Sequence, residues 1–381
     1  MNKIFKVIWS KSKQCYVVVS EMAKNKTGKK KIVVASILAA LAMQTAGVID
    51  GAAATPPVTD IASESIANGT VASGKTNGLA IGNAANSGSN QSIAIGYYSV
   101  ANAAEANPAL PATAVGAGAK ANGYSTVALG LKALAEADSA TALGSKTSAT
   151  GDKSVAVGIS AAATADSATA VGSKTSATGD RSVAVGISAE AKGRYASTLG
   201  AEASAVGNAT AVGAKSIASQ DAAVAVGTDS KATGNYASAL GADATASGND
   251  STAFGHGTVA SGASSTALGS RAKTGGVAGV GIGMLANATN QYGVAIGGES
   301  SSTADNSIAI GRKSSVTGEN GIAIGTFTTS KGANGVAVGT NGTTSELGGV
   351  AVGQAAKSNK FYSVAMGMNV TADGDNSVAL G

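Results

Sequence analysis

Branched apolar residues return at a fixed distance from about Leu79 to the last residue of the chain. Each return ends in the same short phrase: a branched or small residue, Ala, a branched residue and Gly, as in residues 155–158. Of the 21 intervals between the 22 closing glycines, 19 are 14 residues long, one is 20 and one is 13. A fixed period predicts a repeat architecture, in which one small structural unit stacks on the next. These glycines lie at 82, 96, 116, 130, 144, 158, 172, 186, 200, 213, 227, 241, 255, 269, 283, 297, 311, 325, 339, 353, 367 and 381.

Within one repeat, side chains alternate with the period of a β-strand. We count positions from the repeat glycine, which is position 0. Branched residues lie at −3 and −1 with Ala at −2, small residues (Ala, Ser or Thr) lie at +3 and +5, and variable polar residues such as Lys174 and Glu190 lie at +2 and +4. Seven residues separate the two turns, which leaves four or five for an extended segment, too few for a stable helix. The pattern predicts an all-β stack of flattened 14-residue coils with a thin interior.

The second turn of the repeat often pairs Gly with Asp, Asn or Glu, as in Gly151-Asp152 and Gly248-Asn249. These residue types tolerate positive φ or bond their own backbone. We therefore expect the second turn to rely on that local chemistry.

The predicted stack needs a partner. Coils about 4.8 Å apart would form a rod on the order of 100 Å long, but an interior of small side chains buries little apolar area, at about 25 cal/mol per Å². The strand before each glycine carries apolar groups on both faces, and only one face can point inward. We expect further copies of the chain to cover the other; the sequence does not tell which face is which. Phe254, at position −1, is expected to be buried.

Three other architectures compete with this interpretation. A disordered Gly, Ala and Ser chain would fit the 53 glycines, but such a chain has no reason to keep branched residues in phase over 300 positions. Calcium-binding nonapeptide rolls have another period and a regular Asp pattern. Hexapeptide helices of acyltransferases have coils of a different length.

The first 54 residues differ in kind from the repeats. A basic stretch to Lys31 precedes an apolar or small run over residues 32–43 and a small-residue site at Ala52-Ala53-Ala54. This order predicts a secretory signal, with cleavage placed at Ala54 as a guess, and the apolar run is short for a membrane span. The chain then divides into a signal over 1–54, a lead-in or capping segment over 55–78 and repeats over 79–381.

Two parts of the chain resemble known families. Residues 1–9, 15–21 and 23–24 are similar to the extended signal peptide region of Gram-negative autotransporters, and the Ser-Val-Ala-Val-Gly phrase with its 14-residue period resembles the YadA-like head of trimeric autotransporter adhesins. The resemblance implies a left-handed parallel β-roll, a homotrimer displayed on the outer membrane of a Gram-negative bacterium, and attachment to host cells or extracellular matrix. A structural spacer or self-association rod for autoaggregation and biofilm is the alternative, and ice binding by a threonine array is a remote third.

Members of that family normally continue into a neck, a coiled-coil stalk and a membrane barrel. No heptad seam or long alternating strand follows Thr55 in this sequence. We therefore expect a fragment or a truncated reading frame, which would reach the outer membrane only through an anchor absent from this chain.

Charge and cysteine bear on the choice of partners. Residues 1–54 hold nine lysines against two acids, which leaves 18 basic against 20 acidic residues in the remainder. Nucleic-acid binding by the mature surface therefore loses its main support. The single cysteine, Cys15, lies in the signal, so the mature chain needs no disulfide chemistry.

Candidate chemistry is sparse. The one histidine, His256, sits in a turn without a second ligand nearby, and fragments such as residues 279–283 are Gly-rich without a following helix. We predict no enzyme, cofactor or metal site and leave the ligand-binding residues unassigned. Two weaker candidates remain. The insertion around residues 107–111 could bind a ligand, but sequence variation at a surface turn is the simpler explanation. Aromatic residues could form an adhesive stripe, but packing beside turns is the simpler explanation. These aromatic residues are Tyr97, Tyr98, Tyr124, Tyr195, Tyr236, Tyr292, Phe327, Phe361 and Tyr362.

Overall fold

The computed structural model describes residues 5–10, 15–20, 73–74, 78–103 and 110–381 of the 381-residue chain. The chain divides into two compact units, residues 1–56 and 57–381, and each is considered by itself. The described residues contain strands, turns and bends and no helix. The all-β prediction is therefore confirmed for them.

The first unit contains one antiparallel hairpin. Strands β1 (Phe5–Ser10) and β2 (Cys15–Ser20) pair over their whole length, from Phe5 opposite Ser20 to Ser10 opposite Cys15. The remainder of the predicted signal, its cleavage position at Ala54 and most of the lead-in lie outside the described residues.

The second unit is a parallel β-solenoid in which each coil contributes one strand to each of two ladders. Strands of three residues end just before the repeat glycine and form the first ladder. Its 22 strands are β4 (Leu79–Ile81), β6 (Ile93–Ile95), β8 (Thr113–Val115), β10 (Val127–Leu129), β12 (Thr141–Leu143), β14 (Val155–Val157), β16 (Thr169–Val171), β18 (Val183–Val185), β20 (Ser197–Leu199), β22 (Thr210–Val212), β24 (Val224–Val226), β26 (Ser238–Leu240), β28 (Thr252–Phe254), β30 (Thr266–Leu268), β32 (Val280–Ile282), β34 (Val294–Ile296), β36 (Ile308–Ile310), β38 (Ile322–Ile324), β40 (Val336–Val338), β42 (Val350–Val352), β44 (Val364–Met366) and β46 (Val378–Leu380).

Strands of two residues at positions +4 and +5 form the second ladder. They are shorter than the four or five extended residues that the sequence suggests, because the turns take up more of each coil. The 22 strands are β3 (Ser73–Gly74), β5 (Asn86–Ser87), β7 (Val100–Ala101), β9 (Lys120–Ala121), β11 (Leu134–Ala135), β13 (Ser148–Ala149), β15 (Ala162–Ala163), β17 (Ser176–Ala177), β19 (Glu190–Ala191), β21 (Ser204–Ala205), β23 (Ile217–Ala218), β25 (Lys231–Ala232), β27 (Thr245–Ala246), β29 (Val259–Ala260), β31 (Lys273–Thr274), β33 (Asn287–Ala288), β35 (Ser301–Ser302), β37 (Ser315–Val316), β39 (Thr329–Ser330), β41 (Thr343–Thr344), β43 (Lys357–Ser358) and β45 (Thr371–Ala372).

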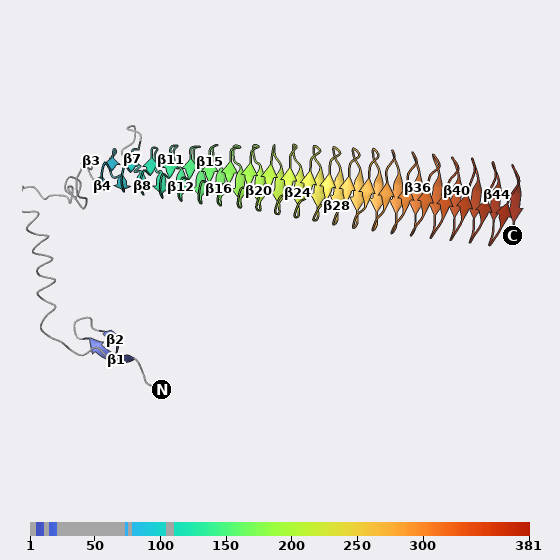
Figure 1. Cartoon of the computed structure of the whole chain (residues 1–381), viewed down its shortest axis with the longest axis horizontal. Coiled ribbons are helices and arrows are strands. Elements are labelled where there is room, and N and C mark those ends of the chain that lie inside the picture. The colour runs from blue at the N-terminus through green and yellow to red at the C-terminus, as the bar shows by residue number, and fades with distance from the viewer. Residues whose placement is uncertain (1–4, 11–14, 21–72, 75–77, 104–109) are drawn as a thin grey trace, which may run out of the picture. The chain divides into compact units, whose positions relative to one another are not determined.

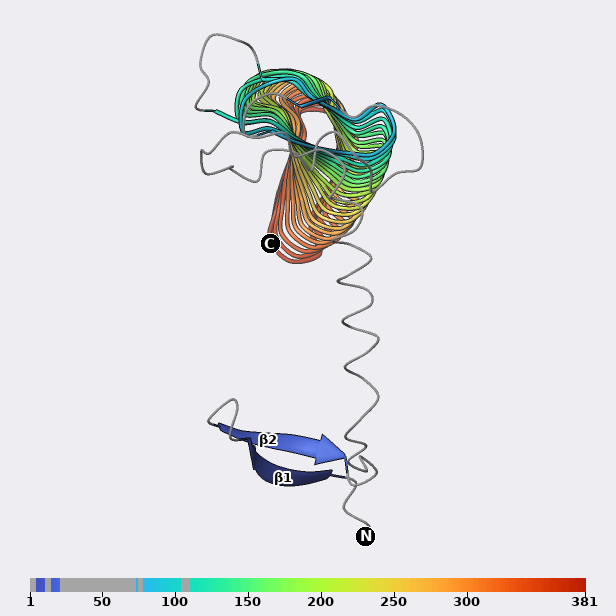
Figure 2. The same ribbon diagram turned by 90° about the vertical axis from the view of Figure 1, so that its left-hand side faces the viewer.

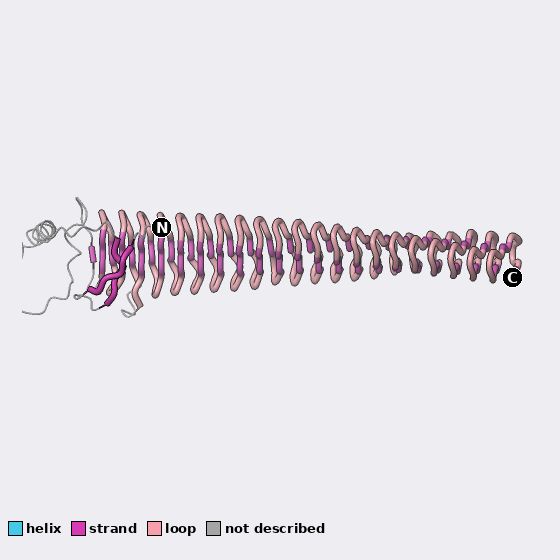
Figure 3. Tube along the Cα trace, turned by 90° about the horizontal axis from the view of Figure 1, so that it is seen from below, coloured by secondary structure: helices cyan, strands magenta, loops and turns pink. Residues whose placement is uncertain are grey.

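Equivalent residues of successive coils stack directly on one another. Val155 pairs with Thr169, Ala156 with Ala170 and Val157 with Val171, and the same register continues along both ladders. Figure 2 shows the flattened outline of one coil repeated down the stack, and Figure 3 shows that the strands turn gradually from one end to the other. The stacked 14-residue coil predicted from the glycine period is confirmed.

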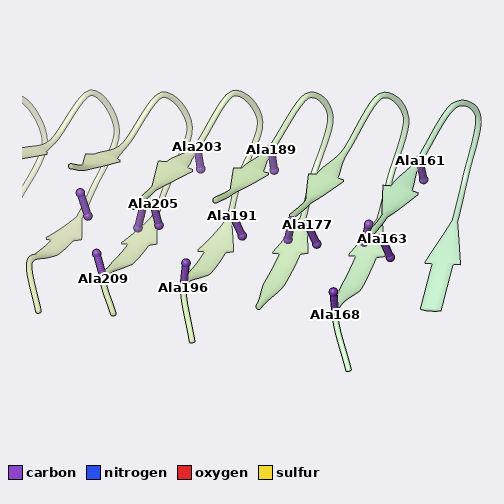
Figure 4. Close-up of a cluster of buried hydrophobic side chains, with 14 of the residues drawn as sticks. Ala161, Ala163, Ala168, Ala177, Ala189, Ala191, Ala196, Ala203, Ala205 and Ala209 are labelled. Atoms are coloured by element: carbon purple, nitrogen blue, oxygen red, sulfur yellow. The ribbon is translucent and has the colours of Figure 1, made fainter. Parts of the chain in front are cut away.

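The interior is built almost entirely from Ala, Ser and Thr. The middle residue of each first-ladder strand, at −2, points inward together with positions −4, +3 and +5, and most of these residues have no exposed surface. Figure 4 shows such alanines of neighbouring coils, among them Ala163, Ala177 and Ala191, directed into the roll. The branched residues at −3 and −1 point outward, so the structure settles which apolar face is internal.

Phe254 is therefore not buried within the chain: 52% of its surface is exposed. The sequence-based expectation is wrong, because position −1 lies on the outer face of the first ladder. A coil this flat has room only for small side chains between its two strands.

Most interior hydroxyls are satisfied locally at both turns; among the described residues, the buried hydroxyls of Ser87, Ser154 and Ser182 have no hydrogen-bond partner. The side chain at +3 donates to the carbonyl of the repeat glycine, as Ser300 does to Gly297 at 2.9 Å, and the side chain at −4 donates to the carbonyl at +7, as Ser251 does to Gly248 at 2.6 Å. Buried polar groups cost little when they are hydrogen-bonded. Ser and Thr can therefore replace Ala inside the roll.

Each coil has two turn positions with left-handed backbone, at +2 and +9. They are occupied by residues as different as Lys174 (φ 56°), Tyr195 (φ 58°) and Leu285 (φ 59°). The expectation that the Gly-Asp or Gly-Asn pair of the second turn carries positive φ is wrong, because that conformation falls on the residue after the pair, Lys153 or Asp250. The glycine at +7 instead leaves room for the next coil: a Cβ on Gly151 would lie 2.0 Å from the carbonyl oxygen of Ala165.

The two irregular intervals leave both ladders intact. Across the 20-residue interval, β6 pairs with β8 and β7 with β9 in the usual register; residues 104–109 of the insertion lie outside the described residues. Across the 13-residue interval, β20 pairs with β22 and β21 with β23. The prediction that these changes are confined to turns is confirmed for the described part of the chain.

Val316 is the largest fully buried side chain among the described residues, and a glycine makes room for it. A Cβ on Gly321, in the same coil, would lie 2.7 Å from Val316 Cγ1. We expect Gly321→Ala to lower the free energy of unfolding by about 2 kcal/mol through overpacking. Adding Val316→Ala should restore part of the loss, because the Cβ would also lie 2.8 Å from the carbonyl oxygen of Gly318; denaturant unfolding of the single and double variants measures this. If the double variant is no more stable than Gly321→Ala alone, the two side chains do not compete for space.

Candidate functional site

The acidic side chains and the histidine of the described repeats are spread along the surface of the roll. Among the described residues, no group of three or more His, Cys, Asp or Glu side chains could hold a metal ion. His256 is exposed in its turn, with Nε2 at 3.6 Å from Asp243 Oδ2. The candidate functional features are therefore extended surfaces rather than a pocket.

The first such surface is an apolar stripe formed by positions −3 and −1 of the first ladder. Position −1 is Val, Ile, Leu, Phe or Met in all 22 coils, and these side chains are half-exposed or exposed in the single chain; Leu199 exposes 54% of its surface. Soluble monomers rarely expose a continuous apolar strip of this length. The stripe is therefore expected to be covered.

Within a coil, a small side chain at −3 is often accompanied by a large one at −1. Where −3 is Ser or Thr, −1 is Leu or Phe in five of eight coils; where −3 is Val, Ile or Leu, −1 is Leu or Phe in only two of 14. Ser197 beside Leu199 and Thr252 beside Phe254 illustrate the first case. Exposed side chains have no reason to compensate for one another's volume, whereas packed ones do. The stripe therefore behaves as a packing surface of constant width.

The second surface is the edge formed by the second turns. In six of the described coils the Asp or Asn at +8 accepts a hydrogen bond from the backbone N–H at +8 of the preceding coil, for example Asp138 Oδ1 from Tyr124 at 3.0 Å and Asn249 Oδ1 from Asn235 at 3.1 Å. The expectation that these residues bond their own backbone is thus corrected. Each side chain ties its coil to the one before it.

The aromatic residues named from the sequence lie in the turns of the coil, and most of them are exposed. Only Tyr124 packs partly against the alanine core. Two basic side chains flank Tyr195, whose hydroxyl lies 2.6 Å from Arg181 Nη1 and whose ring centroid lies 4.8 Å from the guanidinium carbon of Arg194. The exposed members are Tyr97, Tyr98, Tyr195, Tyr236, Tyr292, Phe327, Phe361 and Tyr362.

Tyr97 and Tyr98 form an edge-to-face pair with ring centroids 4.4 Å apart. Partial desolvation, followed by the charge and hydrogen bond of Tyr98, raises the pKa of Tyr97. The phenol of Tyr97 therefore stays uncharged at neutral pH. These exposed aromatics are separated along the roll and do not form one continuous stripe.

No helix among the described residues is both long and apolar enough to span a membrane. The insertion proposed as a weak ligand site lies outside the described residues between 104 and 109 and is not assessed by the structure.

Family models match both parts of the chain. The extended signal peptide of the type V secretion system matches residues 1–48. The YadA head domain repeat matches residues 73–99, overlapping segments over 111–203 and 207–272, and residues 288–314, 317–341 and 371–381. Together the head-repeat matches extend over more than half of the sequence.

Comparison with solved structures finds the collagen-binding domain of the Yersinia adhesin YadA. Sequence identity is 28%, the match covers 40% of this chain and 69% of that one, and the TM-score is 0.23. With so low a TM-score the superposition carries no argument about the fold. No curated protein matches the chain.

An extended signal peptide and head repeats with a 14-residue coil thus occur in one chain, at the positions where the sequence resemblance placed them. The autotransporter signal and family are those of proteins secreted to the surface of Gram-negative bacteria. On the strength of these matches, the chain belongs to the YadA-like trimeric autotransporter adhesins.

Proposed function

We propose that the repeat region is the head of a homotrimeric adhesin that attaches the bacterium to host cells or extracellular matrix. The observation that carries the proposal is the uninterrupted apolar stripe along one face of the roll. Three copies would cover the stripe, and many equivalent coils would multiply weak contacts into avidity. The collagen-binding activity named for the Yersinia domain makes a matrix protein the natural first ligand to test.

The stripe explains why the chain needs sister copies. Its interior consists of small side chains, so each coil gains little apolar burial by itself. Covering the branched residues at −3 and −1 would add a second apolar core outside the roll. Because every coil carries the same stripe, identical rods can pack side by side along their whole length.

A charge introduced into the stripe should dissociate the assembly. We expect the triple variant Leu199→Lys, Leu240→Lys, Phe254→Lys to lower the mass in solution from three chains to one, because unpaired lysines would be buried at the interface. The matched control places three lysines on the outer face of the second ladder, at Thr178, Ser219 and Ser247, and should stay trimeric. Light scattering with circular dichroism separates dissociation from unfolding. If both triple variants keep the mass of the unmodified chain, the stripe is not the interface.

Attachment is tested by binding of the 381-residue chain to immobilised collagen and other matrix proteins. Saturable binding that is lost in the dissociated triple variant supports the adhesin. Self-aggregation of the rods without saturable ligand binding would favour the alternative, a spacer or self-association rod in biofilm, and would overturn the adhesive role.

Display on the outer surface is part of the same proposal, as is the division into signal (1–54), lead-in (55–78) and head (79–381). The extended signal supports export across the inner membrane. Surface labelling of bacteria that express the protein, compared with a periplasmic marker, tests the final location.

A further inference from the structure

Lysines on one edge of the roll share their coil with acids on the other edge. Position +2 lies in the first turn of each coil and position +8 in the second. All five lysines at +2 share their coil with an acid at +8, whereas Arg271 at +2 shares its coil with Val277, and three of the four acids at +2 share theirs with an Asn. The lysine coils are Lys132 with Asp138, Lys146 with Asp152, Lys174 with Asp180, Lys215 with Asp221 and Lys313 with Glu319; the acid coils are Glu202 with Asn208, Asp229 with Asn235, Asp243 with Asn249 and the exception Glu299 with Asp305.

The matched residues do not pair within one chain. The first and second turns lie on opposite edges of the flattened coil (Figure 1). In the described residues the ion pairs formed by these positions run along one edge: Lys313 Nζ lies 3.5 Å from Glu299 in the preceding first turn, and Arg194 Nε lies 3.6 Å from Asp180 in the preceding second turn. These pairs give Lys313 and Asp180 a partner inside the chain, but they run between coils, and the match between a lysine and an acid of the same coil is not explained by them.

The hydrogen bond at +8 does not explain the charge either. Asn249 accepts the backbone N–H of the preceding coil at 3.1 Å as well as Asp166 does at 3.2 Å. An uncharged amide would serve the fold equally. Instead, four carboxylates stack in successive coils at Asp138, Asp152, Asp166 and Asp180, about 4.8 Å apart, and like charges at that distance repel.

A ring of three copies supplies the missing counter-charges. The outer face of the first ladder extends from the second turn to the first, so three such faces directed at a common axis meet at their edges. At each corner, the first-turn edge of one copy then lies beside the second-turn edge of the next. Lys146 and Asp152 belong to one coil, so their heights along the roll differ by less than the spacing between coils, about 4.8 Å, and such a ring would place Lys146 of one copy near Asp152 of its neighbour.

We propose that these two edges form a charged seam between neighbouring copies that fixes the axial register of the trimer. The inference rests on the trimer proposed above. It adds which edges of neighbouring copies meet and which coils lie opposite one another. The apolar stripe is nearly the same in every coil, so by itself it allows one rod to slip past another. A slip of one coil leaves only two or three of the five lysines opposite an acid instead of five.

Zero-length cross-linking tests the seam with the native side chains. A carbodiimide joins a lysine amine to a carboxylate in direct contact as an amide, with loss of water. Isotopically labelled and unlabelled 381-residue chains are mixed by unfolding and refolding, cross-linked, digested and analysed by mass spectrometry. Peptides joined between chains then show mixed isotope labels, whereas the Lys313–Glu299 pair within one chain serves as the unmixed internal control.

The expected result is that Lys146 joins Asp152, and Lys174 joins Asp180, with mixed labels and several-fold more often than acids one coil away. Mixed-label products dominated by Lys146 with Asp138 or Asp166 would overturn the register, as would a trimer that forms the internal control product but no seam product. A light-scattering mass of one chain would overturn the trimer itself, so the two failures are distinguishable.

Charge exchange gives a second measurement. Lys132, Lys146 and Lys174 changed to Glu should lower the midpoint of trimer dissociation, because both edges would then be acidic. Changing Asp138, Asp152 and Asp180 to Lys in the same chain should restore the midpoint in part, and the Asp→Asn set, in which the new amide at position 138 can keep the backbone hydrogen bond that Asp138 accepts, shows what loss of charge alone does. If the combined variant lowers the midpoint as much as the Lys→Glu set and the Asp→Lys set do in sum, the seam is contradicted.

Discussion

Replacing Gly297 by Ala should lower the free energy of unfolding by about 4 kcal/mol. Gly297 has φ of +128°, a region closed to other residues, and a Cβ there would lie 2.6 Å from the carbonyl carbon and oxygen of Gly311 in the next coil. A strained backbone costs about 1–3 kcal/mol and overpacking about the same again. The two costs add because the clash is with backbone, which cannot move aside without breaking the ladder.

The next residue is a matched control. Gly298 has nothing within 4 Å of an added Cβ, so Gly298→Ala should change stability by less than about 0.5 kcal/mol. Denaturant unfolding followed by circular dichroism compares the two variants. If Gly297→Ala unfolds at the same denaturant concentration as Gly298→Ala, the roll tolerates a side chain at the repeat glycine and its spacing has another cause.

The stacking of coils is thus the part of the fold that the sequence predicts best, through the fixed interval between glycines. The stacking of repeat glycines explains why position 0 is Gly in every coil, and a constant interval in turn fixes the in-register ladders. The extent of the repeats and their stacking could be predicted for this reason. The irregular intervals before Gly116 and Gly213 could also be assigned to turns, because the phrase resumes unchanged after each.

The face of the first ladder that lies inside the roll could not be predicted, because the more hydrophobic face is the outer one. Val183 and Val185 are more apolar than Ala184, yet Ala184 is buried and the valines lie outside. The deciding quantity is the separation of the two strands in one coil, which is set by turns and not by composition. Phe254 was misplaced for the same reason.

The candidate surfaces could be predicted only in part from the sequence. Alternation identified the variable polar positions, and the resemblance identified an adhesin. The role of Asp138 as a tie to the preceding coil depends on contacts between coils, and the match between Lys146 and Asp152 gains meaning only once they are known to lie on opposite edges. A coil-by-coil table of charges would have shown the correlation but not its geometry.

The thin interior leads to the second large effect, which should come from Ala177. This residue is fully buried and stacks between Ala163 and Ala191 in the second ladder (Figure 4). Ala177→Leu should lower the free energy of unfolding by about 3 kcal/mol, because the added carbons have no space and the neighbouring alanines cannot retreat.

The adjacent Thr178 is exposed and offers the matched control. Thr178→Leu adds a similar side chain on the outside and should change stability by less than about 0.5 kcal/mol. Hydrogen exchange of the coils around residue 177 measures the effect locally, since each coil contacts only its neighbours and damage should be greatest there. Equal protection in the two variants would mean that the roll can widen to admit a large side chain. The outward position of the apolar residues at −3 and −1, and with it the case for a trimer, would then lose its physical cause.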